Sequence, residues 1–262
     1  MPLADHDTYQ TPPDRRRSLL ARLSPWPELA FYLPVLRIVL RSGRRAVRGT
    51  YDAQAWVEAS RGIVRAMEAV GMRLTVEGMA HLRGLAGPAV FVGNHMSTLE
   101  TFVLPCIIQP VRPVTFVVKD TLLRYPVFGP VLRSRDPIAV GRENPREDLR
   151  AVLEGGRDRL SRGLSIIIFP QGVRSPVFDP AQFNSIGVKL AARAGVPVVP
   201  LALRTDAWGS GRWIKDFGRV DPTLPVRFRF GAPLPPEAKG TQAAVIRFIE
   251  ETLAAWGRPE DG

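Results

Sequence analysis

The chain has 262 residues, which suffice for one large α/β domain or two small ones, and 45% of them are hydrophobic. No stretch approaches the roughly 18 consecutive apolar residues of a membrane-spanning helix, and the acidic, polar amino terminus does not have the pattern of a signal peptide. A net charge of +11 favours an acidic partner: nucleic acid, an anionic membrane surface, a phosphorylated substrate or an acidic carrier protein.

The amino-terminal region divides into two parts. Residues 1–18 are polar and carry an arginine run, so we expect a disordered tail. Residues 19–49 hold a dense aromatic and aliphatic block that arginines interrupt and follow. We expect residues 19–70 to be a helical segment whose amphipathic part lies in a membrane interface. The alternative is a helix that packs on the protein's own core and leaves a basic face in solvent.

From residue 72 onward, strand-like and helix-like stretches alternate, which predicts a single α/β domain over residues 71–262 with a mostly parallel central sheet flanked by helices. Residues 120–135 form a compact segment punctuated by Pro and Gly. Helices are predicted at 52–70, 99–108, 145–161, 184–194 and 241–256, and strands at 72–77, 88–93, 114–119, 138–140, 164–169, 196–203 and 226–230.

Cys106 is the only cysteine of the chain, so no internal disulfide can form, and no spacing of Cys and His predicts a zinc site. It lies in an apolar run, where we expect a buried, inert thiol. A reducing cytoplasm fits this cysteine usage.

His95 follows an apolar strand, and Glu100 comes five residues later. On one continuous helix these two side chains would point about 140° apart, so they can meet only if the chain turns from strand to helix between them. Glu100 would then fix the tautomer of the imidazole, whose other nitrogen could take a proton from a hydroxyl. Two plainer interpretations stay open: a packed polar histidine, and a capping box formed by Ser97 and Glu100.

Two further clusters follow strands. Arg174 and Ser175 come after the strand at 164–169 and a Gly turn, a position that suits phosphate binding at the end of a parallel strand. Lys119 and Arg142 stand at the ends of two other predicted strands. The apolar loop between them could line a groove or belong to the core, and Arg174 could equally be a solvated residue of a surface turn.

Together these residues form four blocks in order, and the chain resembles the glycerolipid and lysophospholipid acyltransferases typified by 1-acylglycerol-3-phosphate acyltransferase. The resemblance covers roughly residues 70–205. The blocks are Gly93-Asn94-His95 with Glu100, Lys119 with Pro126 and Gly129 leading to Ile138, Val140 and Arg142, Phe169-Pro170 with Gly172, Arg174 and Ser175, and Val196-Pro197-Val198-Val199-Pro200.

The resemblance implies a reaction and its partners. An acyl group would move from acyl-CoA or acyl carrier protein to the free hydroxyl of a lysophospholipid, most simply 1-acylglycerol-3-phosphate, giving phosphatidic acid without a metal or another cofactor. The enzyme would lie on the cytoplasmic face of the membrane as a peripheral or monotopic protein, docked on the anionic surface through its amino-terminal helices.

The same resemblance implies roles for individual residues. His95 would be the general base and Glu100 the acid that orients it. Arg174, helped by Arg142 and Lys119, would hold the phosphate of the acceptor. Gln171, Gly172 and Ser175 complete the predicted substrate-binding set.

Two positions differ from the family pattern and concern the acceptor. Glu100 replaces the usual Asp, and Gln171 replaces the usual Glu of the Phe-Pro-Glu-Gly block. Gln171 keeps an acceptor oxygen without the negative charge. This leaves open another lysolipid acceptor, for example a lyso-aminolipid, or a catalytically silent relative that binds lipid. Nucleic-acid binding is disfavoured because the basic residues are scattered and no recognised motif is present.

Overall fold

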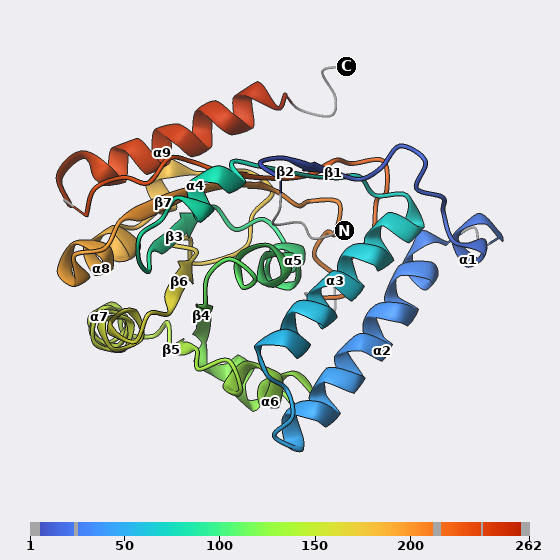
Figure 1. The fold of residues 1–262 in the computed structure, drawn as a ribbon, viewed down its shortest axis with the longest axis horizontal. Helices are drawn as coiled ribbons and strands as arrows, with labels where there is room; N and C mark the ends of the chain where they lie inside the picture. The colour runs from blue at the N-terminus through green and yellow to red at the C-terminus, as the bar shows by residue number, and fades with distance from the viewer. Residues whose placement is uncertain (1–5, 24–25, 212–215, 237, 258–262) are drawn as a thin grey trace.

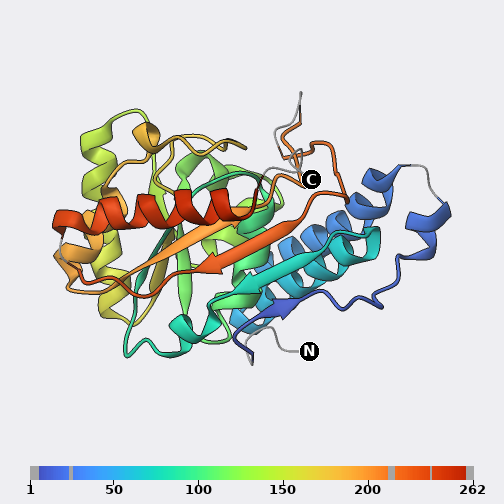
Figure 2. The same cartoon turned by 90° about the horizontal axis from the view of Figure 1, so that it is seen from above.

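The computed structural model describes residues 6–23, 26–211, 216–236 and 238–257, and these contain one eight-stranded sheet (Figures 1 and 2). The strand order is β1-β2-β8-β7-β3-β6-β4-β5. The strands are β1 (Tyr9–Gln10), β2 (Leu74–Glu77), β3 (Val90–Gly93), β4 (Val114–Lys119), β5 (Ile138–Val140), β6 (Ser165–Ile168), β7 (Val198–Arg204) and β8 (Val226–Phe230).

Most neighbouring strands run parallel, which confirms the predicted α/β class. Strand β3 is parallel to both β6 and β7, β4 is parallel to β5 and β6, and β2 is parallel to β8. Within the described residues the antiparallel pairs are β1 with β2 and β7 with β8. Strand β8 therefore joins the β2 end of the sheet to its parallel centre.

Helices cover both faces of the sheet. On one face, α3 (Ala53–Val70) and α5 (Leu99–Ile108) share a core with Phe91 of β3. On the other face, α7 (Pro145–Ser161), α8 (Ile186–Ala194) and α9 (Ala238–Ala255) pack with Val90 and Val92. Alternate residues of the same strand thus feed two separate cores, as the two-residue period of a strand dictates (Figure 1).

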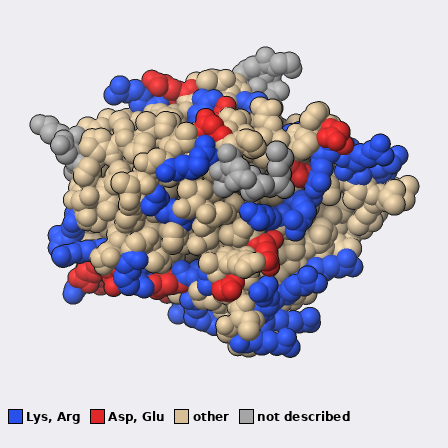
Figure 3. Space-filling view, in the orientation of Figure 1, with Lys and Arg blue, Asp and Glu red and all other residues tan. Residues whose placement is uncertain are grey.

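The amino-terminal helices are α1 (Leu19–Leu23) and α2 (Pro27–Val47). Phe31 and Val35 of α2 are buried in the main core, as the plainer interpretation expected. Other apolar side chains of this region are exposed, among them Leu23 at 82% and Trp26 at 66%. Basic side chains gather over the part of the molecule where α1 and α2 lie (Figure 3). Within the residues that the structure describes, no helix is long and apolar enough to cross a membrane.

The amino-terminal arm is ordered where we expected disorder, so the prediction of a tail over residues 1–18 is wrong at residues 9–11. Tyr9–Gln10 forms β1 on the edge of β2. The buried carboxylate of Glu68 on α3 explains the order, because it accepts hydrogen bonds from Tyr9 Oη at 2.6 Å and Thr11 Oγ1 at 3.0 Å. Arg15 Nε adds an ion pair to Glu68 at 3.2 Å.

Four short elements complete the described part of the fold. Helix α4 (Met79–Arg83) was not predicted, and the Pro- and Gly-punctuated segment contains a 3-10 turn, η1 (Asp120–Arg124), and helix α6 (Phe128–Arg133). A further 3-10 turn, η2, spans Pro180–Gln182. Cys106 is buried in α5, as predicted, and burial raises the pKa of its thiol to about 11.

Candidate active site

The predicted polar residues lie at one edge of the sheet, where its parallel strands end. His95 follows β3, Gln171 follows β6, Lys119 ends β4 and Arg142 follows β5. These four strands are adjacent and parallel, so their carboxyl ends face the same way. This edge is where open α/β sheets bind ligands.

The two residues before His95 fix the exit of the chain from β3. A Cβ atom on Gly93 would lie 2.8 Å from the carbonyl oxygen of Leu201, so only glycine permits this approach of β3 to β7. The buried side chain of Asn94 then donates to the carbonyl of Leu203 at 2.9 Å and accepts from its N–H at 2.8 Å. This amide continues the strand pairing by one step and directs His95 away from the sheet.

His95 and Glu100 meet, as the strand-to-helix turn allows. The distance from His95 Nδ1 to Glu100 Oε1 is 2.8 Å. The fully buried carboxylate also accepts from the N–H groups of Met96 at 2.8 Å and Ser97 at 3.0 Å, and from the hydroxyl of Thr205. Glu100 therefore contacts the imidazole and also accepts the N–H groups at the turn into α5. Its bond from Ser97 N–H is the glutamate half of the predicted capping box.

The charge state of Glu100 follows from these contacts. Burial raises the pKa of this carboxyl, but the hydrogen bonds from His95, Thr205 and Ser97 and the attraction to His95 outweigh it and leave the pKa below its ordinary value. As an ionised acceptor, Glu100 accepts a hydrogen bond from the N–H at Nδ1 and so favours the tautomer with its proton on Nδ1. That leaves a lone pair on Nε2, for which the described residues provide no hydrogen-bond donor.

Three further contacts fix the imidazole and its backbone. The ring of His95 stacks on Phe169, with centroids 4.5 Å apart and planes 5° from parallel. Gln171 Oε1 accepts from the backbone N–H of His95 at 2.7 Å, and Ser175 N donates to its carbonyl at 2.9 Å. This contact requires only an acceptor oxygen at position 171. The side-chain amide of Gln171 provides that oxygen without a negative charge.

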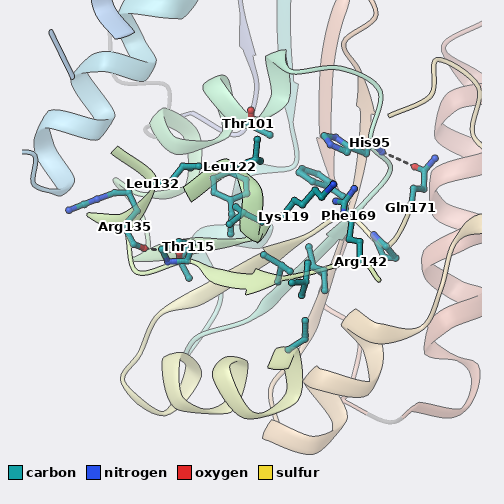
Figure 4. A pocket seen from close by; sticks show the side chains of 18 of the residues that line it. His95, Thr101, Thr115, Lys119, Leu122, Leu132, Arg135, Arg142, Phe169 and Gln171 are labelled. Carbon is teal, nitrogen blue, oxygen red and sulfur yellow. Dashed lines mark hydrogen bonds between the residues drawn. The ribbon is translucent and has the colours of Figure 1, made fainter. Parts of the chain in front are cut away.

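A cavity of about 680 Å³ opens beside His95 (Figure 4). Its wall is mostly apolar between α2, α3, α5, α6 and β4, and polar near His95. A volume of this size suits a drug-sized or lipid-like ligand. The apolar wall includes Ile38, Val39, Trp56, Ile63, Phe102, Phe116, Val118, Leu122, Phe128, Val131, Leu132 and Phe169.

Cationic side chains line the polar end. Lys119, Arg142 and Lys189 all border the cavity, and neither ammonium group has an ion-pair partner in the described part of the chain. Arg142 has a left-handed backbone, with φ 64°, which the carboxylate of Asp148 supports by accepting its N–H at 3.0 Å. Its guanidinium donates to the carbonyl of Gly172 at 2.5 Å. The result is a positive surface close to the histidine.

Arg174 lies outside the cavity wall. It does not border the cavity, and its guanidinium forms an ion pair with Asp216 at 2.7 Å and a hydrogen bond with Thr98 at the start of α5. The side chain of Ser175 donates to the carbonyl of Val177 at 2.7 Å. The structure thus brings His95, Lys119, Arg142, Gln171 and Gly172 together around the cavity, with Glu100 buried against His95. Arg174 and Ser175 do not border the cavity and instead contact the loop that carries His95 and the start of α5.

Sequence reasoning did not assign a role to Thr205, Phe169, Lys189 or Asp216. Thr205 follows β7, so its position after a buried strand was an available signal. Phe169 stood inside a recognised block, although nothing in the spacing indicated stacking on His95. Asp216 and Lys189 carry no local pattern, because only the folded chain brings them to this edge.

Thr205 offers a test of the carboxylate's environment. We expect Thr205→Val to lower the free energy of unfolding by roughly 1.5 kcal/mol at pH 7, since a hydrogen bond to a charged group is lost. Because the pKa of Glu100 would rise toward its ordinary value, the difference from the wild type should shrink as the pH falls through the wild-type pKa of this group. Denaturant unfolding at several pH values measures both effects, and Thr205→Ser is the control that keeps the hydroxyl.

A histidine–carboxylate pair at the carboxyl edge of a mostly parallel sheet is an arrangement that could activate a hydroxyl or thiol for group transfer. Residues 73–204 match a family model described as Acyltransferase, which spans half of the chain. The chain belongs to this family, and the resemblance seen in the four sequence blocks is confirmed.

Named relatives agree with this assignment. The chain is 29% identical over 233 residues to the 1-acyl-sn-glycerol-3-phosphate acyltransferase of Pseudomonas aeruginosa, covering 88% of this chain and 82% of that protein. It is 29% identical over 119 residues to the enzyme of that name from Escherichia coli, covering 45% of this chain and 48% of the relative. The crystal structure of the 1-acyl-sn-glycerophosphate (LPA) acyltransferase PlsC from Thermotoga maritima shares the fold, with a TM-score of 0.66 at 18% identity over 88% of this chain and 95% of the other.

Proposed function

We propose that this acyltransferase moves a fatty acyl group from an acyl thioester to the free hydroxyl of 1-acylglycerol-3-phosphate, forming phosphatidic acid for phospholipid synthesis. The observation that carries the proposal is a buried His–Glu pair at the polar end of an apolar cavity, with Lys119 and Arg142 beside it. The names of the relatives from Pseudomonas aeruginosa and Escherichia coli support the choice of acceptor. The donor is acyl-CoA or acyl carrier protein, both of which are anionic and suit a chain of net charge +11.

The chemistry follows from the tautomer of His95, which carries its proton on Nδ1 and leaves a lone pair on Nε2. Nε2 takes the proton of the acceptor hydroxyl while the oxygen attacks the thioester carbonyl carbon. The C–S bond of the resulting tetrahedral species breaks, and the departing thiolate takes the proton back from the imidazolium. Glu100 stabilises the imidazolium between these steps through the 2.8 Å contact to Nδ1. Each proton is returned, so the two residues end the cycle as they began it.

Phosphate binding in this proposal depends on Lys119 and Arg142, which border the cavity, as Gln171 and Gly172 also do. A guanidinium and an ammonium suit a phosphomonoester dianion. Arg174 was expected to lead this contact, but it could reach the phosphate only by giving up Asp216. We therefore assign Arg174 and Ser175 to the support of the histidine loop.

The proposal also places the enzyme on a membrane surface, at the cytoplasmic face. The exposed Leu23, Trp26 and Leu29, together with the arginines of α2, form an apolar and basic side that suits an anionic lipid interface. The apolar cavity is bordered by Ile38 and Val39 of the same helix. An acyl chain could then pass from the bilayer to the histidine along α2.

Purified enzyme given acyl-CoA or acyl carrier protein and a panel of lysophospholipids tests the proposal. We expect acylated product from 1-acylglycerol-3-phosphate. We expect Lys119→Ala to raise the KM for this acceptor at least about tenfold, since a contact with a charged group is worth about 1.5 kcal/mol or more. Arg146→Ala removes one positive charge outside the cavity and is the control.

The panel also separates the alternatives. Product from a different lysolipid alone would show that the acceptor is wrong. Vesicle binding without product from any acceptor would show a silent lipid-binding relative. An unchanged KM in Lys119→Ala, with activity present, would leave the reaction standing and remove Lys119 from the phosphate site.

A further inference from the structure

One acidic side chain from the connection between β7 and β8 reaches the start of α5. Asp216 Oδ1 accepts from Thr98 Oγ1 at 2.9 Å and from Arg174 Nη1 at 2.7 Å. The same guanidinium nitrogen also donates to the hydroxyl of Thr98. Three side chains that lie far apart in the sequence therefore form one closed group, which we call the Asp216 cluster.

The hydroxyl of Thr98 can join this cluster because it does not cap the helix. Thr98 stands at the N-cap of α5, where a threonine hydroxyl ordinarily accepts an N–H of the first helical turn. Its side chain makes no such bond here. The carboxylate of Glu100 instead accepts the N–H groups of Met96 and Ser97. The Asp216 cluster therefore holds a residue that lies between His95 and Glu100 in the chain.

The other side of the cluster reaches the backbone of His95. Ser175 N donates to the carbonyl of His95 at 2.9 Å. Since Ser175 directly follows Arg174, the ion pair of Arg174 with Asp216 fixes where this N–H lies. The turn that carries His95 is thus held from Thr98 on one side and from Ser175 on the other.

The connection that carries Asp216 is itself attached to α2. Tyr32 Oη of this helix donates to the carbonyl of Gly218 at 2.6 Å. An isolated antiparallel bridge also pairs Trp208 with Val220. These contacts hold the backbone beside Asp216, so its carboxylate approaches the cluster from a fixed position.

Asp216 balances the charge of a mostly buried arginine. The side chain of Arg174 is 20% exposed, and Asp216 is its one ion-pair partner among the described residues. Removing this carboxylate would leave a largely desolvated cation without a counter-charge, which is unfavourable. The guanidinium would then turn toward water, and the segment that ends at Ser175 would lose its attachment to α5.

These contacts give Asp216 a role in the proposed acyl transfer, on which the inference rests. We infer that Asp216 is a positioning residue, which acts through Arg174 and Thr98. It holds the strand-to-helix turn in the shape that brings His95 to Glu100. A displacement of about 1 Å at a reacting group can cost about a hundredfold in rate, so a loosened turn should lower kcat. The cavity walls stay in place, so the KM values should change little.

A measurement without substrate tests the positioning. The chain has three histidines, so histidine labelled with ¹⁵N gives few signals. The Nδ1 proton of His95, which is held against Glu100, should resonate at low field, and His95→Gln identifies this signal by removing it. We expect Asp216→Ala to shift or broaden the signal. Asp221→Ala removes a carboxylate of the same connection that binds the hydroxyl of Thr223, and should leave the signal unchanged.

Steady-state rates extend the test to the reaction. Expressed per folded protein, kcat of Asp216→Ala should fall at least about tenfold, with little change in the KM of either substrate. Arg174→Ala should lower kcat by a similar factor, and the double variant should be no slower than the slower single variant, because the two residues act as one unit. Asp216→Glu keeps the carboxylate and should recover most of the lost kcat, whereas Asp221→Ala should keep the wild-type rate.

A second variant gives an answer if Asp216→Ala does not fold. Asp216→Asn keeps the size of the side chain and an acceptor oxygen, and removes only the charge. Arg174 still loses its counter-charge, so the signal of His95 and kcat should change in the same direction as in Asp216→Ala, by a smaller amount.

The outcomes separate this inference from the proposed function. A wild type that transfers no acyl group would overturn the proposed function, and the signal of His95 would still decide whether Asp216 positions it. An active enzyme whose signal and kcat stay unchanged in Asp216→Ala and Asp216→Asn would overturn only the role of Asp216. A lower KM for the acceptor in these variants would also overturn it, because Asp216 would then withhold Arg174 from the phosphate of the substrate.

Discussion

Replacing His95 with alanine should lower kcat by about a hundredfold or more, because general-base catalysis by a positioned side chain contributes about 10²- to 10⁴-fold. The KM for both substrates should change little, since the imidazole acts on the reacting hydroxyl and the cavity walls stay in place. The imidazole is largely buried, with 14% of the side chain exposed, and stacks on Phe169. Steady-state rates with a fixed acyl donor and acceptor measure the effect.

Two controls make the His95 result specific. His81 of α4 does not border the cavity, so His81→Ala should keep full activity. His95→Gln keeps a polar side chain without a titratable nitrogen and should be as inactive as His95→Ala. Full activity in either His95 variant would contradict the mechanism, whereas equal thermal stability with lost activity would exclude unfolding as the cause.

Glu100→Gln should cost both activity and stability. The wild-type carboxylate accepts from five donors: His95 Nδ1, the N–H groups of Met96 and Ser97, and the hydroxyls of Ser97 and Thr205. The amide of the introduced Gln has only one acceptor oxygen. Its NH₂ group would face N–H and O–H donors and could form no hydrogen bond with them. Breaking such a buried arrangement costs about 3 to 5 kcal/mol in the free energy of unfolding. Loss of the tautomer that Glu100 fixes should lower kcat at least about a hundredfold.

The pH dependence of the same variant has a definite sign. Because the pKa of folded Glu100 lies below its ordinary value of about 4.5, ionisation stabilises the wild type above that value, and this contribution is lost as the pH falls through the folded pKa. Glu100→Gln has no such group, so its stability should depend less on pH in the acid range. Glu154→Gln, on the exposed face of α7, is the matched control and should follow the wild type.

Glu100→Asp tests the departure from the family pattern. The shorter side chain cannot reach both Thr205, which follows β7, and the turn at Met96 with the geometry that Glu has. We expect partial activity, between that of the wild type and that of Glu100→Gln. Activity equal to the wild type would show that the loop adjusts to the shorter acid.

The sheet could be predicted from the sequence because its strands are short apolar runs bounded by Gly and Pro. Ser165–Ile168 and Val198–Arg204 are buried along their whole length and read clearly as strands. The order of the strands in the sheet was harder to predict from the sequence. The position of β8, parallel to β2 and antiparallel to β7, depends on the path of the chain after residue 204, where the sequence shows no regular hydrophobic period.

The contacts of the site likewise include some that the sequence reveals and some that it does not. His95 and Glu100 are five residues apart, so a local turn brings them together and the sequence reveals it. Thr205 lies 105 residues from Glu100, and Asp216 lies 42 residues from Arg174. Such contacts are products of the assembled sheet. The ordered arm was missed for this reason too, because Tyr9 finds its acceptor on Glu68, 59 residues later.

The two edges of the sheet bear on how the protein behaves at high concentration. An exposed edge strand offers unpaired backbone groups to a second chain and can seed aggregation. Here one edge is β1, with 2 residues, and the other is β5, with 3 residues. Strands this short present too few free groups to template a growing sheet. Strand β1 thus covers the free edge of the longer β2. A variant that lacks residues 1–11 would expose this edge and should aggregate more readily than the intact protein.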